Sequence, residues 1–274
     1  MTFHRTIRFL VTLLATLVAI NAHAVADRAA ASRTHTSLGL YSFTADEATP
    51  AETTPAEMAL LGSMFDDGVG VPQDYGKALL WYARAARAGN AEAMNRLGIM
   101  HAMAHGVPRD YALAFEWYLQ ATKSGSMSAI SNIATAYFHG LGVQQSYVEA
   151  ARWLKLVAVQ GEPSAQNKLA MLYKEGLGVP RDPAMAIDLL QRAVAQRYAP
   201  AMANLGSMYA DGIGVQRDDV RAYALLHAAL EIGVPSGLRE VSYDQLGRVA
   251  ARLNGKELPR AHQLSLKFSA TEIH

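Results

Sequence analysis

The stretch LGSMYADGIGVQRD, residues 205–218, decides the fold, because versions of it recur along the chain at one constant spacing. Its valine, Val215, has four counterparts, each 36 residues from the next: Val71, Val107, Val143 and Val179. Ten residues before each valine stands an aliphatic side chain: Leu61, Leu97, Ile133, Leu169 and Leu205. Ten residues after it stands a large apolar one: Trp81, Trp117, Trp153, Leu189 and Leu225. A constant period of this length indicates a repeat protein.

Each copy also carries residues that end one helix and begin the next. Glycines occupy two alternate positions before the valine, as in Gly212 and Gly214, although the second copy has Ala104 at the first position. Three residues after the valine comes a side chain suited to cap a helix N-terminus: Asp74, Asp110, Ser146, Asp182 and Asp218. A further glycine stops that helix in four copies. Arg197 stands there in the fourth copy, so we expect that stop to be made differently.

The apolar residues predict two helices per copy. After the first cap, apolar residues recur at helical spacing: Ala78, Trp81, Tyr82 and Ala85. The preceding helix, roughly 56–66, carries Met58, Leu61, Gly62 and Phe65 on one stripe. The tiny residue at position 62 and its counterparts favours close approach of two helices.

One helix pair cannot bury its own stripe, so the copies must stack. We therefore expect an all-α fold, an alpha–alpha superhelix, with five repeats over residues 55–234. The pattern changes after Pro235. Residues 235–274 are predicted to form C-terminal capping helices at 237–253 and 256–269. Their expected inward residues are Leu246, Val249, Leu253, Leu264 and Phe268.

The N-terminus has the pattern of an export signal. Arg5 and Arg8 form a basic start, the run FLVTLLATLVAI over 9–20 is largely apolar, and Ala22-His23-Ala24 supplies small residues before a cut. We expect residues 1–24 to be a cleaved signal peptide, and the mature protein to be periplasmic or secreted. Residues 25–54, poor in periodic apolar residues, are expected to be a flexible leader. An uncleaved anchor is the alternative.

The unit LGSMYADGIGVQRD, followed by a helix such as KALLWYARAARAG (77–89), resembles the Sel-one-like repeat (SLR), a relative of the tetratricopeptide repeat. The likeness covers about two-thirds of the chain and recurs five times. It implies an alpha–alpha superhelix that acts as an adaptor in protein complexes. In bacteria, exported proteins of this kind are often linked to the cell envelope.

The composition of the chain excludes several classes of binding and catalytic site. The formal net charge of +1 offers no electrostatic footprint for nucleic acid, and no second segment is apolar enough to insert into a membrane. The absence of cysteine excludes disulfides, thiolate metal sites and cysteine nucleophiles. We expect no cofactor and no catalytic residues, so the protein is predicted not to be an enzyme.

Two short sequence motifs suggest other functions, a beta-lactam hydrolase and a metal site. Lys123-Ser124-Gly125 matches the lysine-containing triplet of penicillin-recognising enzymes, and some similar exported repeat proteins carry a beta-lactamase label. No serine has a lysine three residues on, however, so the nucleophile motif is missing. His101 and His105 have a spacing that can chelate a metal on a helix, with His139 as a further candidate. Because His101 shares a column with Phe65 and Tyr137, we expect it to pack in the core and predict no metal site.

A partner is expected to bind the side of the first helices that faces away from the core, in the concave groove. On that side of the first helices, the residue types at equivalent positions differ from one copy to the next, whereas the core positions do not. The residues on that side are Arg96, Asn132, Lys168 and Asn204, which form a polar ladder, then Ile99, Thr135, Met171 and Ser207, and finally His139 and Glu175. Such a ladder can hold the backbone of an extended peptide by hydrogen bonds. A solvated face without function is the plain alternative.

The sequence thus predicts a non-enzymatic scaffold or adaptor of the bacterial cell envelope, with a protein or peptide partner. A cell-wall or beta-lactam hydrolase and a glycan or small-ligand binder remain alternatives.

Overall fold

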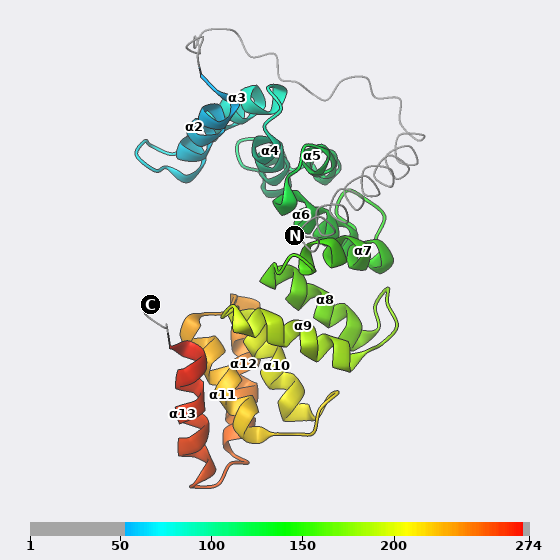
Figure 1. The fold of residues 1–274 in the computed structure, drawn as a ribbon. Helices are drawn as coiled ribbons and strands as arrows, with labels where there is room; N and C mark the ends of the chain where they lie inside the picture. The colour runs from blue at the N-terminus through cyan, green and yellow to red at the C-terminus, as the bar shows by residue number, and fades with distance from the viewer. Residues whose placement is uncertain (1–52, 271–274) are drawn as a thin grey trace, which may run out of the picture. The chain divides into compact units, whose positions relative to one another are not determined.

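The structure, a computed structural model, describes residues 53–270 (Figure 1). The predicted signal peptide and residues 25–52 of the predicted leader lie outside the described residues. Within 53–270 every regular element is a helix, which confirms the all-α repeat fold. The helices are α2 (Pro55–Asp67), α3 (Tyr75–Arg87), α4 (Ala91–Met103), α5 (Tyr111–Lys123), α6 (Met127–His139), α7 (Tyr147–Ala158), α8 (Pro163–Glu175), α9 (Pro183–Ala195), α10 (Ala199–Asp211), α11 (Asp219–Ile232), α12 (Ser236–Ala250) and α13 (Glu257–Ser269).

The helices divide into two compact units, and the division falls inside α6. The first unit holds α2 to α5 with α6 up to Ile133, and the second holds the rest of α6 with α7 to α13. In each unit the two helices of a repeat pack together, as α4 does with α5 and α10 with α11. The second helix of one repeat also packs on the first helix of the next, as α3 does on α4 and α9 on α10. The predicted stacking is therefore present within each unit.

The predicted caps are made by the predicted residues. Asp74 accepts a hydrogen bond from the backbone N–H of Lys77 at 3.0 Å, and Asp182 accepts one from Met185 at 3.0 Å. Such a cap satisfies a backbone donor that the first turn of a helix leaves unpaired, and contributes about 1 kcal/mol. The second helices therefore begin where the sequence predicts.

The core stripes are buried, with one difference at the first repeat. Trp153 and Leu154 are buried in α7, and Met202 and Leu205 in α10. In α2, by contrast, Met58, Leu61 and Phe65 are only half-buried. The first helix of a later repeat is covered by the second helix of the repeat before it, and the described chain offers α2 no such neighbour. The tiny residue of each first helix permits the close approach that was expected, since a Cβ on Gly98 would lie 2.5 Å from the Tyr118 ring.

The second loop glycine meets two demands. Gly142 has φ +72°, in the left-handed region, and a Cβ on it would lie 2.0 Å from the backbone oxygen of Tyr111. Gly178 stands in the same relation to Tyr147, whose carbonyl carbon would be 2.2 Å away. The loop of one repeat thus sits directly on the start of the second helix of the previous repeat. Glycine is needed there both for its backbone angle and for its lack of a side chain.

The expectation for Arg197 is wrong. Arg197 adopts φ 59° and Ala104 adopts φ 63°, so both take the left-handed conformation that glycine takes in the other copies. This conformation costs a residue with a Cβ about 1–2 kcal/mol. The second helix of the fourth copy therefore stops as it does in the first three copies, where the glycine donates to the carbonyl three residues earlier. The copies that hold Ala104 and Arg197 carry local strain.

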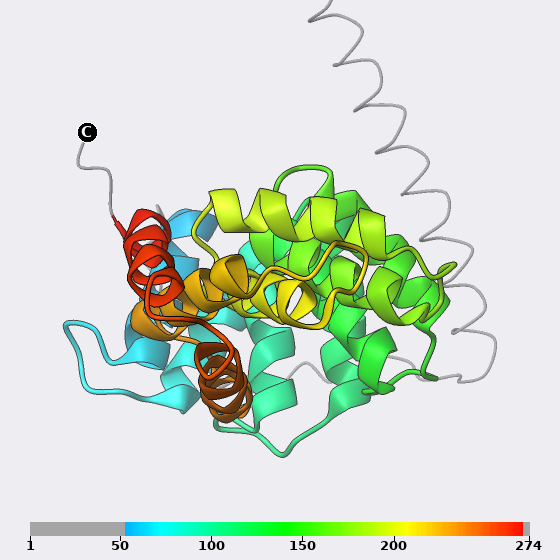
Figure 2. The same cartoon turned by 90° about the horizontal axis from the view of Figure 1, so that it is seen from below.

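The two C-terminal helices are not a sixth repeat pair. Helix α12 packs on α11 and α10, as the first helix of a next repeat does, but α13 packs along α11 and makes little contact with α12. Both views show α13 alongside α11 (Figures 1 and 2). The predicted inward residues are only partly correct, because Val249 is buried whereas Leu246, Leu253, Leu264 and Phe268 are half-buried. The buried positions that the sequence prediction missed are Ser242, Gln245, Ala261 and Ser265.

Candidate partner-binding site

The four ladder residues lie on the first helices, in two pairs. Arg96 on α4 and Asn132 on α6 belong to the first unit, and Lys168 on α8 and Asn204 on α10 belong to the second. Lys168 is exposed and the other three are half-buried. Each therefore reaches the surface, but each also has a protein partner.

In the first unit, the side-chain amide of Asn132 donates a 2.8 Å hydrogen bond to the side-chain oxygen of Asn95 on α4. Asn95 is itself buried, so this bond satisfies a polar group that water cannot reach. Arg96 lies 3.5 Å from Glu92, one turn earlier on the same helix. This exposed ion pair leaves the guanidinium accessible and contributes little stability.

In the second unit, Asn204 donates a 2.8 Å hydrogen bond to Asn167 on α8. The ammonium of Lys168 donates a 3.1 Å hydrogen bond to the hydroxyl of Thr135 on α6. The protein atoms around Lys168 displace part of the water that would solvate its ammonium, which lowers the pKa of Lys168, and the charge of Glu162 opposes that shift. Asn132, Lys168 and Asn204 thus join neighbouring first helices, a role that the sequence prediction did not include, whereas Arg96 pairs within its own helix. Asn95 and Asn167, each 37 residues before its partner, are the signal that could have revealed it.

The remaining predicted site residues divide by exposure. Ile99, Thr135, Met171 and Ser207 are half-buried, whereas His139 and Glu175 are exposed. Ser207 accepts a 2.8 Å hydrogen bond from Gln245 of α12. Two apolar side chains of the same columns are exposed as well, Leu60 at 62% and Met103 at 59%. We call the surface that these residues form on the first helices of each unit the first-helix face. In each unit it combines apolar and polar groups that water can reach.

A buried carboxylate lies close to the first ladder residue. Asp66, 8% exposed, is the one acidic side chain buried within residues 53–270. The phenol of Tyr82 donates to it at 3.4 Å, and the imidazole Nδ1 of His105 lies 3.9 Å from it. Desolvation raises the pKa of Asp66, Asp67 adds to the rise, and the charge of Arg96 opposes it. This cluster was not predicted from the sequence because its members come from α2, α3 and the loop after α4.

The two histidines of the metal hypothesis have different surroundings. His101 is 3% exposed, and burial lowers its pKa while the charge of Asp110 opposes the shift. His105 instead stacks on Tyr75, with ring centroids 4.7 Å apart. Over the described part of the chain, no three histidine, aspartate or glutamate side chains are placed to share a metal ion. His101 thus packs in the core, as its column predicts.

The Lys123-Ser124-Gly125 triplet ends a helix. Lys123 is the last residue of α5, Ser124 is its C-cap, and Gly125 follows with φ +98°. The Ser124 hydroxyl lies 3.4 Å from the sulfur of Met94. The triplet therefore has a structural role at the expected helix stop.

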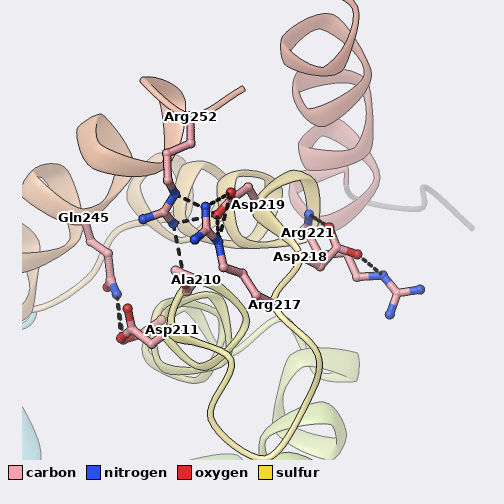
Figure 3. Close-up of polar contacts among 9 residues, drawn as sticks. Ala210, Asp211, Arg217, Asp218, Asp219, Arg221, Gln245 and Arg252 are labelled. Atoms are coloured by element: carbon pink, nitrogen blue, oxygen red, sulfur yellow. Dashed lines mark hydrogen bonds and ion pairs between the residues drawn. The ribbon is translucent and has the colours of Figure 1, made fainter. Parts of the chain in front are cut away.

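A polar network fixes α12 at the end of the second unit (Figure 3). The guanidinium of Arg252 donates to Asp219 at 3.0 Å and to the carbonyl of Ala210 at 3.3 Å. Arg217 donates to the same carboxylate at 2.7 Å. Desolvation would raise the pKa of Asp219, but the hydrogen bonds from both arginines outweigh it, and the pKa is lowered. The network connects α10 and α11 with Arg252, two residues after the end of α12.

The five copies match the family model described as Sel1 repeat, at residues 58–90, 91–126, 128–161, 163–198 and 199–234. The chain belongs to the Sel1 repeat family. Sel1 repeat proteins generally mediate protein–protein interactions and are generally non-catalytic. No curated protein sequence matches this Sel1 repeat protein.

Solved structures show the same fold. A protective antigen of uropathogenic Escherichia coli with an SLR fold is 27% identical, with a TM-score of 0.72, over 78% of this chain and 45% of the antigen. The Sel1 repeat protein thus spans less than half of that antigen. A Sel1 repeat protein from Oxalobacter formigenes is 29% identical, with a TM-score of 0.65, over 78% of this chain and 88% of that one. Within residues 53–270, none of the helices has the length and apolar character needed to span a bilayer.

Proposed function

We propose that this protein is a non-enzymatic scaffold of the bacterial cell envelope, periplasmic or secreted, which binds a partner protein or peptide on the first-helix face. The observation that carries the proposal is the contrast between the columns of five Sel1 repeats. Core columns repeat in every copy, whereas the face presents a different set in each, such as Arg96 and Met103 in one and His139 in the next. Differing side chains on a constant scaffold are what recognition of one particular partner requires.

The contacts of the face support recognition of an extended segment. Lys168 and Arg96 keep donors at the surface, and Leu60 and Met103 offer exposed apolar contacts. Inter-repeat hydrogen bonds hold the ladder side chains in place, so less conformational entropy is lost when a partner binds.

The binding test is capture from envelope extract with immobilised protein. The test variant carries Arg96→Ala, Lys168→Ala and Glu175→Ala, which remove surface groups and spare the Asn95–Asn132 and Asn167–Asn204 bonds. The matched control carries Glu116→Ala, Arg152→Ala and Gln191→Ala, three exposed residues of the second helices. A protein held by the wild type and the control but lost with the test variant supports the proposal. Equal capture by all three contradicts the assigned face.

The location has its own test. Expression in a Gram-negative host, followed by fractionation and N-terminal sequencing, should recover a chain that begins after Ala24 or Ala26. Recovery from the cytoplasm with an intact N-terminus would refute export without affecting the binding result.

A further inference from the structure

Helix α2 has an open side that the first helices of the other four repeats lack. Met58, Leu61 and Met64 lie three residues apart on this side of α2, and all three are half-buried. The counterparts of Leu61 in the other repeats are Leu97, Ile133, Leu169 and Leu205. None of these is more than 3% exposed, and none of the counterparts of Met64 is more than 4% exposed. Side chains that belong to the core in every later repeat are therefore still reached by water on α2.

The open side of α2 is the one that a preceding second helix covers in later repeats. Helices α3, α7 and α9 pack in this way on α4, α8 and α10. Within residues 53–270, by contrast, α2 packs on α3 and only lightly on α4. The end repeats of a helical array need a cap with a polar outer face. A cap for α2 therefore has to come from outside the described residues.

The chain enters α2 at a fixed point. Thr54 has an extended backbone, with ψ 156°, and its hydroxyl accepts a 3.2 Å hydrogen bond from the backbone N–H of Glu57. The Glu57 carboxylate in turn accepts a 2.7 Å hydrogen bond from the backbone N–H of Thr54. Pro55 follows, and a residue that precedes proline disfavours helical geometry. Helix α2 therefore does not extend towards the N-terminus, and the chain changes direction at Thr54.

One short segment before α2 has the composition of a cap. Between residues 26 and 52, all the large apolar side chains fall in one six-residue stretch: Leu38, Leu40, Tyr41 and Phe43. Residues 44–54 connect this stretch to α2, and eleven residues span up to about 36 Å when extended. Helix α2 has 13 residues and is about 20 Å long. The connection is therefore long enough for the stretch to reach any point on the open side.

We propose that residues 38–43 pack on the open side of α2 and cap the N-terminal end of the repeat array. A short tether gives the segment an effective concentration near α2 of the order of millimolar, which favours it over a second copy at micromolar concentration. Packing removes apolar surface of the segment and of Met58, Leu61 and Met64 from water. Leu60, 62% exposed on the first-helix face, stays open to a partner.

Thiol labelling tests the proposal, because the chain has no cysteine of its own. Leu61→Cys places a thiol on the open side, and its rate of reaction with a maleimide is measured with and without Tyr41→Ser and Phe43→Ser. We expect the two serine substitutions to raise the rate by about tenfold, since they remove the apolar contacts that hold the segment over the thiol. Leu60→Cys, one residue away on the first-helix face, is the matched control and should react at the same rate in both backgrounds.

Hydrogen exchange gives a second readout that does not require Leu61→Cys to fold. In a chain without an introduced cysteine, Tyr41→Ser with Phe43→Ser should lower the protection of α2 by about tenfold and leave α10 and α11 unchanged. Thr36→Ser with Thr44→Ser, which alters polar residues on either side of the segment, is the control and should leave α2 unchanged.

Three outcomes overturn the cap. The first is an equal labelling rate of the Leu61→Cys thiol, or equal protection of α2, with and without the serine substitutions at Tyr41 and Phe43. The second is slow labelling that becomes faster when the protein is diluted, because a second copy would then cover α2. The third is a loss of protection that extends to α10 and α11, which would show general destabilisation. No partner is present in either experiment, so the result is independent of the partner-binding test.

Discussion

The guanidinium of Arg197 donates a hydrogen bond to the backbone carbonyl of Ser269, 72 residues later in the chain. Arg197 lies in the turn between α9 and α10, and Ser269 is the last residue of α13. The bond explains why a residue with a Cβ occupies a left-handed position that glycine fills in other copies. The strain of one residue is offset by a contact that holds the C-terminal end of α13.

Arg197→Gly should therefore have opposite effects on two parts of the second unit. It removes backbone strain at the turn, but it also removes a hydrogen bond from a charged donor, worth about 1.5–3 kcal/mol. We expect hydrogen-exchange protection of α13 to fall, while α9 and α10 keep theirs or gain some. Arg197→Lys, which keeps charge and strain, should lie between the two. An unchanged α13 in the glycine variant would show that the bond carries no weight.

Ala104→Gly should stabilise the first unit, because Ala104 has the same strain without a compensating side-chain bond. The expected gain is about 0.5–1 kcal/mol, since part of the relieved strain is lost to greater freedom of the unfolded chain. Thermal unfolding followed by circular dichroism measures it. Ala88→Gly is the control, because Ala88 is a C-cap with φ −83° and should lose stability. A lower Tm for Ala104→Gly would refute the strain argument.

Gly142→Ala should be far more damaging than Gly125→Ala. Both glycines have positive φ, but a Cβ on Gly142 would lie 2.0 Å from the Tyr111 oxygen, whereas one on Gly125 meets nothing within 4 Å. The strain alone predicts about 1–2 kcal/mol for Gly125→Ala. The added clash should bring Gly142→Ala above about 3 kcal/mol. Urea unfolding of both variants tests this, and similar losses would mean that the loop can move away from α5.

Asp66→Asn should raise the Tm at pH 7. Burial raises the pKa of Asp66 above its ordinary value, so the native state favours the protonated form. Its stability contribution is then fully present below the unfolded pKa and is lost as pH rises through the folded pKa. Asparagine keeps a polar partner for Tyr82 without the desolvated charge.

The difference in Tm between Asp66→Asn and the wild type should shrink as the pH is lowered from 7 towards 4. In a chain of this size, 1 kcal/mol corresponds to about 2–4 °C, which calorimetry resolves. Asp67→Asn, an exposed neighbour, is the control and should show little change. A lower Tm for Asp66→Asn at pH 7 would mean that attraction to Arg96 and His105 outweighs burial.

The repeat architecture and its helix starts could be predicted from the sequence, because they depend on neighbours within one copy. Asp74 caps its own helix through the N–H of Lys77, and Trp153 lies on the stripe that its spacing predicts. Because the repeats have a constant period of 36 residues, a cap or core position identified in one copy predicts the equivalent position in the others. The residues on the first-helix face were placed by the same register.

Only the tertiary structure decided what those residues contact. The bond from Asn204 to Asn167, the burial of Asp66 and the packing of α13 on α11 join positions from different helices. Arg197 illustrates the reason: its backbone angle looks unfavourable within its own repeat and becomes understandable once Ser269 lies beside it. Local sequence determines which helices form, whereas the energy of packing between distant segments determines which side chains are left free to bind.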